Sequence, residues 1–330
     1  MPDEPAATVT IPQPSTVKVA MRWRAWAALF GLSAIAGACG SWWWLFDLFA
    51  HFLPYQTVGL AVCAVGLWWK RDRIAAGITT IVLIGCLWFI GPYYMPRPVP
   101  TAGERVSLRV CNVFCHNTEP ERVLKLLRDS PTDVVVLLEI TIEWSQRFQD
   151  LRDVYPHMQF EPEAGSFGIG ILSRKPWANL NHRSFGRQKL PSLTIDFPLE
   201  RGGTWLLVAT HPLPPISSFN AAARDEQLAR VATYCNEHDG PIVVAGDHNA
   251  SPWSHAFRGL CHDGRLTDSS LGFGIHPTWP TIGPLAVIPI DHILTRGMGV
   301  SSRQVEPRVG SDHHPLRADL VIPWLSRLGV

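Results

Sequence analysis

The sequence predicts a two-part chain in which three membrane-spanning helices precede a mixed α/β domain. Charge is the first observation: residues 1–100 carry only eleven of the 57 charged side chains, and the remaining 230 residues carry the others. The second is the pattern beyond residue 104, where short apolar runs alternate with amphipathic helical ones. A chain with this asymmetry is neither a uniformly soluble nor a uniformly membrane-embedded protein.

Three apolar stretches account for the shortage of charge in the first part. They cover residues 25–46, 48–69 and 74–96, and only His51 and Pro54 interrupt the second. About 20 apolar residues cross a hydrocarbon core of about 30 Å as a helix. We therefore expect spanning helices within residues 25–96, at about 25–46, 51–69 and 74–95. The alternative, three buried helices of a soluble domain, would need a polar layer that residues 20–100 cannot supply.

The positions of lysine and arginine predict the orientation of these helices. Basic side chains precede the first helix and fill the turn between the second and third, whereas the first turn, around Asp47 and His51, has none. The positive-inside rule then places the N-terminal tail, residues 1–24, in the cytoplasm and everything after residue 97 outside it. A cleaved secretory signal ending near residues 36–38 is the alternative, although the apolar run continues through that site. The basic residues are Lys18, Arg22, Arg24, Lys70, Arg71 and Arg73.

A proline-rich linker, residues 97–104, separates the helices from the second part. The α/β domain is expected to cover residues 105–323 and to leave a short tail, residues 324–330. Within it the apolar patterns predict one long helix over residues 218–236 and a shorter one over 119–128. Strands are predicted at 106–114, 134–140, 167–173, 192–197, 205–210, 242–245, 287–294 and 316–322.

The seven cysteines divide between the two parts. Cys39, Cys63 and Cys86 lie one in each predicted membrane helix, where a small apolar thiol is ordinary. The other four match no zinc-binding spacing, so we expect one disulfide or none in the α/β domain, with the pairing left open. These four are Cys111, Cys115, Cys235 and Cys261.

Polar side chains gather where the predicted strands end. Strand ends at the loop-bearing edge of a sheet bring residues from distant parts of a chain to one ligand. All of these side chains offer oxygen or imidazole nitrogen, a set that suits a hard divalent cation such as Mg²⁺ together with acid and base groups. Each alone has an ordinary structural explanation, for example a turn at residues 246–249. They are Asn112, Glu139, His211, Asp247, Asn249, Asp291, His292, Asp312, His313 and His314.

In this order the segments resemble the endonuclease/exonuclease/phosphatase superfamily of Mg²⁺-dependent phosphoesterases, over residues 105–322. The Gly-Asp-His-Asn segment at 246–249 and the Ser-Asp-His-His segment at 311–314 are its most specific pieces. Matching pieces at 109–113, 136–139, 168–174, 210–212 and 290–294 complete it. The resemblance implies a DNase I-like four-layer α/β sandwich, in which helices flank two mixed sheets. With its three-helix anchor, the chain looks like the membrane-bound VanJ-like branch associated with teicoplanin resistance.

The resemblance also implies a metal centre and a water site. Glu139 would bind Mg²⁺, or Mn²⁺ in its place, with Asn112 beside it and Asp312 completing or flanking the metal site. Asp247 and Asn249 would orient the attacking water, with Asp247 as the proton acceptor. Phosphate ester hydrolysis needs both, because a cation neutralises phosphate charge while an oriented water attacks.

The histidines complete the implied site. His211 would contact the phosphate, and His313 would stabilise the developing charge while Asp291 fixes its tautomer. His248 and His314 are further candidate contacts to substrate. His248 stands where the family usually has an apolar or aromatic residue, so a packing role is the alternative for it.

The predicted activity is hydrolysis of a phosphate ester or pyrophosphate in an envelope lipid or a lipid-linked cell-wall intermediate. Residues 101–330 have a formal charge of −2, so they lack the basic excess typical of a domain that tracks nucleic acid. A short linker would hold the domain near the bilayer, which raises the effective concentration of lipid substrates. The alternatives are an anchored extracellular nuclease and a non-catalytic protein that binds or senses a phosphorylated ligand. The oligomeric state is left open.

Overall fold

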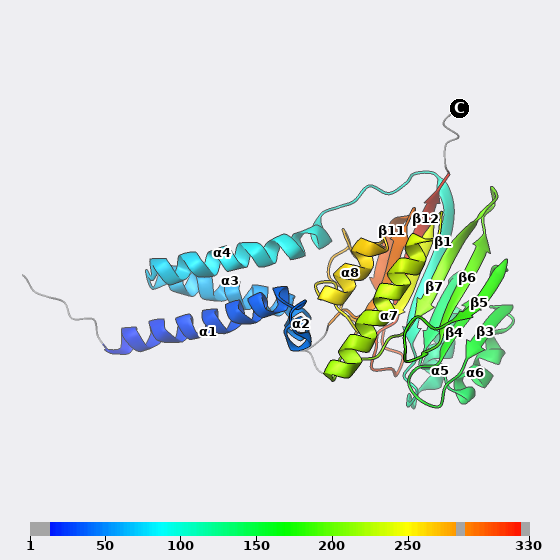
Figure 1. Cartoon of the computed structure of the whole chain (residues 1–330), viewed down its shortest axis with the longest axis horizontal. Helices are drawn as coiled ribbons and strands as arrows, with labels where there is room; N and C mark the ends of the chain where they lie inside the picture. The colour runs from blue at the N-terminus through cyan, green and yellow to red at the C-terminus, as the bar shows by residue number, and fades with distance from the viewer. Residues whose placement is uncertain (1–13, 282–287, 325–330) are drawn as a thin grey trace, which may run out of the picture. The chain divides into compact units, whose positions relative to one another are not determined.

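The computed structural model describes residues 14–281 and 288–324 and divides into two compact units. The helical unit contains the described residues up to Ala36 together with Leu53–Ile90. The α/β unit contains Gly37–Phe52 and the described residues from Gly91 onward. Both are drawn with their elements labelled in Figure 1. Residues 37–46, expected within the first spanning helix, therefore belong to the α/β unit together with the first turn around Asp47 and His51.

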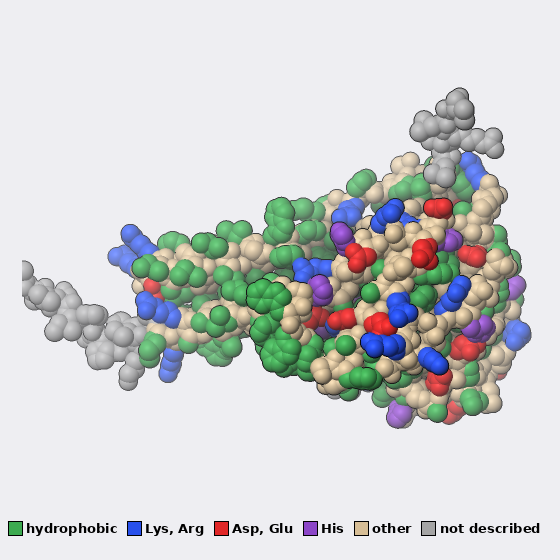
Figure 2. All heavy atoms as spheres, viewed as in Figure 1, with side chains coloured by type: hydrophobic (Ala, Val, Ile, Leu, Met, Phe, Trp, Pro, Cys, Tyr) green, Lys and Arg blue, Asp and Glu red, His purple; other side chains and the backbone are tan. Residues whose placement is uncertain are grey.

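The helical unit is built from α1 (Pro14–Ala38), α3 (Leu53–Trp69) and α4 (Arg73–Ile90). On the face drawn in Figure 2, hydrophobic side chains cover much of this unit. Trp69, Ile74 and Trp88 are each exposed by at least 80%. An exposed apolar surface of this extent marks an interaction with another apolar phase, such as a partner or a bilayer.

Among the described residues, one helical segment, Arg73–Tyr94, is long and apolar enough by itself to cross a membrane. The helices α2 (Trp44–Ala50) and α3 pass the same test only as a pair, across a bend of 66°. Three spans are therefore not confirmed. The expected helix over 25–46 is also interrupted, because α1 ends at Ala38 and the chain turns before α2 begins. Gly40 permits this turn, since a side chain there would collide with Asp47.

Two six-stranded sheets form the centre of the α/β unit. Sheet A consists of β1 (Gly103–Asn112), β2 (Val134–Leu138), β3 (His157–Glu161), β4 (Ile169–Ser173), β11 (Gly299–Val305) and β12 (Leu316–Pro323). Its strand order is β11-β12-β1-β2-β4-β3, and β1 runs parallel to β2.

Sheet B has the same number of strands and again one parallel pair. Its strands are β5 (Asn179–Arg183), β6 (Ser192–Pro198), β7 (Thr204–Thr210), β8 (Ile242–Asp247), β9 (Thr267–Asp268) and β10 (Asp291–Arg296). Their order is β5-β6-β7-β8-β10-β9, and β7 runs parallel to β8. Each sheet therefore has one pair of neighbouring strands whose carboxyl ends meet at the same edge.

The two sheets face one another and helices cover their outer faces, which gives four layers. The central core contains apolar side chains from both sheets. Helices α5 (Pro120–Asp129) and α6 (Ile142–Arg147) pack on sheet A, and α7 (Ser218–Asn236) and α8 (His255–Asp263) pack on sheet B, where Figure 1 shows them in front of the strands. Short 3-10 helices, Gly91–Tyr94 and Phe148–Leu151, complete the elements. The expected four-layer α/β architecture is confirmed.

The sequence predicted the buried strands well and the exposed ones poorly. β2, β4 and β8 are buried along their whole length and were found from their apolar runs. β3 is only half-buried and β5 is mostly exposed, so neither shows an apolar run. The predicted strand 287–294 begins only at Asp291, and its first residue lies outside the described residues. All seven cysteines lie in the described part of the chain and carry free thiols.

Candidate active site

The parallel strand pairs bring the predicted site residues to one edge of each sheet. On sheet A, Asn112 at the end of β1 lies opposite Leu138, so Glu139 follows immediately on the neighbouring strand. On sheet B, His211 follows the end of β7 and Asp247 ends the adjacent β8. Asp291 begins β10 directly opposite Asp247 in the antiparallel register. Strand pairing alone therefore assembles two polar clusters from five distant parts of the chain.

The sheet A cluster is a carboxylate held by neutral donors. The Asn112 Nδ2 donates to Glu139 Oε1 at 3.0 Å, and the backbone N–H of Cys115 donates to Glu139 Oε2 at 3.0 Å. Glu139 has a φ of 63°, a strained conformation for a residue with a side chain. Among the described residues, no lysine, arginine or histidine forms an ion pair with Glu139. Its charge is fixed in place but not neutralised.

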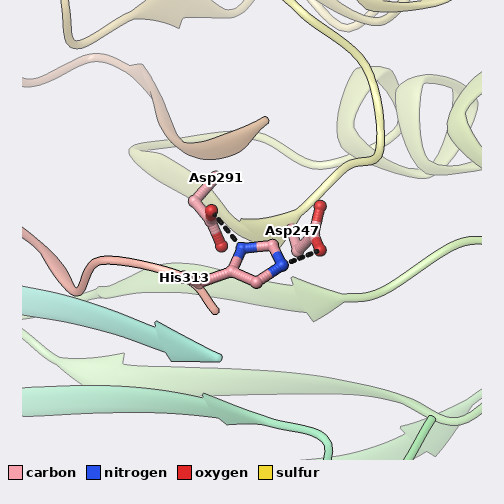
Figure 3. Close-up of side chains that lie close together, drawn as sticks. All are labelled: Asp247, Asp291 and His313. Carbon is pink, nitrogen blue, oxygen red and sulfur yellow. Dashed lines mark hydrogen bonds and ion pairs between the residues drawn. The ribbon is translucent and has the colours of Figure 1, made fainter. Parts of the chain in front are cut away.

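The sheet B cluster centres on His313, which lies between two aspartates (Figure 3). Its Nδ1 lies 2.7 Å from Asp291 Oδ2, and its Nε2 lies 3.6 Å from Asp247 Oδ2. All three residues are at most 4% exposed. This geometry fixes the orientation of the ring, because one nitrogen is committed to Asp291 and the other faces Asp247.

Electrostatics favour the charged forms of His313 and Asp247, whereas burial raises the pKa of Asp291. Burial alone would lower the pKa of His313, but the charges of Asp291 and Asp247 outweigh burial and raise the pKa to about 10. Burial alone would likewise raise the pKa of Asp247, yet the charge of His313 and the hydrogen bond from His211 lower it to about 2. At neutral pH the cluster therefore presents an imidazolium cation beside an ionised carboxylate.

The loop that carries His313 connects the two clusters. Ser311 Oγ donates to the backbone oxygen of Asn112 at 2.7 Å and accepts from the backbone N–H of His313 at 3.0 Å. Asp312 accepts from the Trp279 indole through Oδ2 at 3.1 Å, while its buried Oδ1 has no partner in the described part of the chain. This loop thus brings a free carboxylate oxygen alongside the end of β1.

His211 and Asn249 complete the sheet B edge. His211 Nε2 lies 3.4 Å from Asp247 Oδ2, and the ring contacts Phe167. The backbone N–H of Asn249 donates to Asp247 Oδ1 at 2.9 Å, and Asn249 Nδ2 donates to the backbone oxygen of Pro212 at 3.0 Å. Asn249 therefore holds the carboxylate of Asp247 and the loop that follows His211 at the same time.

Two candidate substrate contacts lie away from these carboxylates. His248 is completely buried, and its ring stacks on His292 and lies against Phe257. This burial favours the packing role for His248 over contact with a substrate. His314 is half-buried, and its Nδ1 lies 3.1 Å from the backbone oxygen of Glu306. His292 holds the backbone oxygen of Ala250 through its Nε2 at 2.8 Å.

Sequence reasoning missed the groups that support this edge. Thr278 Oγ1 accepts from the backbone N–H of Asp291 at 3.3 Å, and Trp279 holds Asp312. Arg224 on α7 donates from Nη1 to the backbone oxygen of Asn249 at 3.1 Å. None follows a predicted strand, so the rule of reading strand ends could not find them. Arg224 lies in the middle of the predicted helix 218–236, where an arginine is usually exposed. Its role in the site becomes visible only from the structure, in which it is buried.

The site fits a divalent cation. Two buried carboxylate oxygens, Asp291 Oδ1 and Asp312 Oδ1, have no hydrogen-bond partner among the described residues. Within the same residues, the carboxylate of Glu139 has no ion-pair partner. Asp247, Asp291 and His313 offer ligand atoms that lie within 4.8 Å of one another. The Nδ1 of His313 is already engaged by Asp291, whereas Asn112 and the backbone N–H of Cys115 orient the Glu139 carboxylate. The all-oxygen set around Glu139 is also of the kind that a hard cation prefers.

Curated relatives and solved structures resemble this chain at low identity. A UPF0294 protein of Vibrio vulnificus is 22% identical over 233 residues, covering 66% of this chain and 78% of that protein. Another, from Vibrio parahaemolyticus, is 25% identical over 150 residues, covering 44% of this chain and 47% of that protein.

The solved structures resemble about two thirds of this chain, and the likeness covers nearly the whole length of several of them. A humanized TDP2 from D. rerio is 18% identical with a TM-score of 0.55, covering 66% of this chain and 98% of that one. The human Nocturnin catalytic domain with bound sulfate is 15% identical with a TM-score of 0.55, covering 66% and 96%. These likenesses show a shared fold.

The match to a family is the most direct of the comparisons. A model of the endonuclease/exonuclease/phosphatase family matches residues 110–313, which is more than half of the chain and includes both clusters at the sheet edges. This chain therefore belongs to the endonuclease/exonuclease/phosphatase family.

Proposed function

We propose that this protein is a membrane-anchored, metal-dependent phosphoesterase that hydrolyses a phosphate ester or pyrophosphate of an envelope lipid or a lipid-linked cell-wall intermediate. Members of the family are typically hydrolases of phosphoester bonds that use a divalent metal. The observation that carries the proposal is that the site contains two complementary groups. The carboxylate of Glu139 has no counter-charge among the described residues and would bind a metal cation. The imidazolium of His313, held by Asp291, would interact with a phosphate.

The metal centre would be held by Glu139, Asn112 and Asp312. When bound, Mg²⁺ or Mn²⁺ would supply positive charge to a phosphate oxygen and lower the pKa of a coordinated water. The hydrogen bonds from Asn112 and from the backbone of Cys115 hold the carboxylate of Glu139 for this purpose. Asn112 acts through its oxygen as well, which accepts from the backbone N–H of Phe114 at 3.0 Å.

The sheet B residues would orient water and stabilise charge. The carboxylate of Asp247 accepts hydrogen bonds and stays ionised at neutral pH, so it can orient an attacking water. A carboxylate with a pKa of about 2 is a weak base, so orientation is its principal contribution. Asn249 fixes that carboxylate. The imidazolium of His313, aimed by Asp291, would stabilise the charge that develops on the phosphate, and His211 would contact the same group.

The lipid substrate and the anchor are supported by the first hundred residues. The segment Arg73–Tyr94 can cross a membrane by length and composition, and β1 of the α/β unit starts at Gly103, so few residues separate the two. A catalytic domain on so short a tether would meet lipid phosphates at high effective concentration. The orientation with the α/β unit outside the cytoplasm rests on the basic residues that flank the helices. Resistance to teicoplanin would follow if the substrate belongs to cell-wall synthesis.

A nuclease activity is the second candidate. The structure of D. rerio TDP2 complexed with a single-strand DNA product has a TM-score of 0.56 to this chain, at 18% identity, covering 66% of this chain and 99% of that one. The formal charge of −2 over residues 101–330 favours the lipid substrate over this alternative.

The substrate class is tested with the full chain in detergent micelles and in lipid nanodiscs. Mg²⁺-dependent turnover is measured on a polyprenyl pyrophosphate, on a generic phosphodiester and on single-stranded DNA. We expect the lipid pyrophosphate to be preferred, and more so in nanodiscs. Preferred cleavage of DNA would support the nuclease instead. Equal behaviour of the wild type and the variant His313→Ala on every substrate would contradict both enzymatic functions and leave a binding protein.

A further inference from the structure

A buried arginine on α7 ties the candidate active site to a segment that the sequence places between two membrane helices. Arg224 is only 1% exposed. Its Nη1 donates to the backbone oxygen of Asn249 at 3.1 Å, and its Nη2 donates to Asp47 Oδ2 at 2.8 Å. Asp47 lies on α2, which belongs to the same compact unit as α7 and β8. One guanidinium therefore bridges α2 and the loop that follows β8.

Asp47 is engaged on both of its oxygens. Oδ2 pairs with Arg224, and Oδ1 accepts from the backbone N–H of His255 at the start of α8. Asp47 is only 2% exposed, so water has little access to replace the hydrogen bonds that Arg224 and His255 make to its carboxylate. Removing this carboxylate would leave the guanidinium of Arg224 buried with its charge only partly compensated, because its other ion-pair partner, Asp225, is substantially exposed.

The same segment makes a second contact with the loop. His51, just after α2, accepts through Nδ1 from the backbone N–H of Ser251 at 3.2 Å. His51 is also buried. Residues 247–251 are thus held at Asn249 through Arg224 and Asp47, and at Ser251 through His51. The Asp47–Arg224 pair joins residues 177 positions apart in sequence, and the His51–Ser251 contact joins residues 200 apart.

The conformation of Asn249 places its contacts. Asn249 has a φ of 49°, in the left-handed region that asparagine enters more readily than most residues with a side chain. In this conformation its backbone N–H reaches Asp247 and its side chain reaches the loop after His211. A shift of Asn249 would therefore move the Asp247 carboxylate and its distance to His211 together.

We propose that Asp47 and Arg224 are positioning residues of the active site, which they serve by holding the 247–251 loop in its catalytic geometry. The proposal rests on the proposed function. It implies that the functional unit begins well before residue 110, where the family match starts, because the segment 37–52 completes the site. A fragment that starts at the proline-rich linker would keep the side chains of the site without the group that holds them.

The test uses the full chain in detergent with three variants of the ion pair. Asp47→Asn removes the negative charge at nearly constant size. Arg224→Lys keeps the positive charge but lacks the planar guanidinium that donates to two acceptors at once. Asp47→Glu keeps the carboxylate on a longer side chain. The matched control is Glu226→Gln, which breaks exposed ion pairs with Arg187 and Arg230 on and beside the same helix. Two quantities are measured, kcat and KM on the preferred phosphoester, and backbone hydrogen exchange over residues 247–251.

We expect Asp47→Asn and Arg224→Lys to lower kcat about 10- to 100-fold with KM changed by less than about twofold, because misplacing catalytic groups affects the reacting geometry rather than binding. Hydrogen exchange over 247–251 should rise about tenfold or more in both variants, while exchange in β6 stays constant. Asp47→Glu should recover part of both effects. Glu226→Gln should match the wild type.

The outcomes separate this proposal from the proposed function. If exchange rises but kcat is unchanged, the ion pair only stabilises the fold and the positioning role is overturned. If neither quantity changes, the bridge does not hold the loop and the proposal is overturned as well. If the wild type shows no turnover on any phosphoester while exchange rises in both variants, the proposed function has failed and the support of the loop by Asp47 and Arg224 stands.

Discussion

The two edges of the candidate site carry the same kind of side chain in opposite electrostatic states. At the edge of sheet A, Glu139 accepts hydrogen bonds from Asn112 and a backbone N–H, and no cation of the described chain neutralises it. At the edge of sheet B, Asp247 and Asp291 flank a histidine that their own charges keep protonated. The carboxylate at the edge of sheet A therefore has no cationic partner among the described residues, whereas the carboxylates at the edge of sheet B have the imidazolium of His313.

Under the proposed function, this difference would give the two edges different roles. A fixed carboxylate without a counter-charge would attract an external cation, whose charge would offset the cost of burying the carboxylate. An imidazolium that is already paired needs no metal and can face a phosphate. We therefore expect substitutions at the edge of sheet A to change the metal concentration needed for activity, and substitutions at the edge of sheet B to lower kcat.

The largest effect is expected from sheet B. His313→Gln keeps a hydrogen-bonding side chain but removes the positive charge, so kcat should fall about 10²- to 10³-fold. The Mg²⁺ concentration for half-maximal activity should stay within about twofold of the wild type, because the edge of sheet A is intact. The measurement is a Mg²⁺ titration of turnover, and His262→Gln on the exposed end of α8 serves as the control.

A substitution on sheet A should have a smaller effect on kcat and a larger one on metal binding. Glu139→Gln removes the charge that attracts the cation, so the half-activating Mg²⁺ concentration should rise about 10- to 100-fold, with much of the activity recovered at saturating metal. The opposite pattern, a metal defect in His313→Gln and none in Glu139→Gln, would move the metal to the cluster of Asp247, Asp291 and His313.

The smallest effect is expected on the pH dependence of stability, through the buried ring of His248, which stacks on His292. Burial and the neighbouring His292 lower the pKa of His248 to about 3, compared with a usual value of 6.5. The neutral ring therefore contributes stability above about pH 6.5, and that contribution is lost as the pH falls toward 3, because the unfolded state binds the proton first. Between pH 7 and pH 5 this single linkage is worth on the order of 2 kcal/mol.

His248→Phe removes the titrating group at a position where both ring nitrogens lack partners in the described residues. The difference in melting temperature between pH 7 and pH 5 should then be smaller than in the wild type, as followed by intrinsic fluorescence. The exposed His262→Phe is the control and should keep the full difference. An unchanged difference in His248→Phe would show that His248 is accessible to protons in the folded state, which would revive its role as a substrate contact.

Much of this site could be predicted because strand ends are visible in sequence. Apolar runs located β2, β7 and β8, and the polar residue at the end of each run lies at the edge of its sheet that carries the candidate site, β2 in sheet A and β7 and β8 in sheet B. His248 shows the limit of the same rule. It lies between Asp247 and Asn249 in sequence, yet it points away from them into a buried stack, because neighbouring residues at a strand end face opposite sides of the sheet.

The sequence by itself determined the division into an apolar and a polar part, the α/β class and the identity of the candidate catalytic residues. These depend on local patterns, hydropathy period and the residue types at strand ends. Tertiary structure alone decided that His313 lies between Asp247 and Asp291 and that Asp47 pairs with Arg224. Both depend on a pairing between residues far apart along the chain, and the energy of such a pairing arises only when folding brings both partners out of water together.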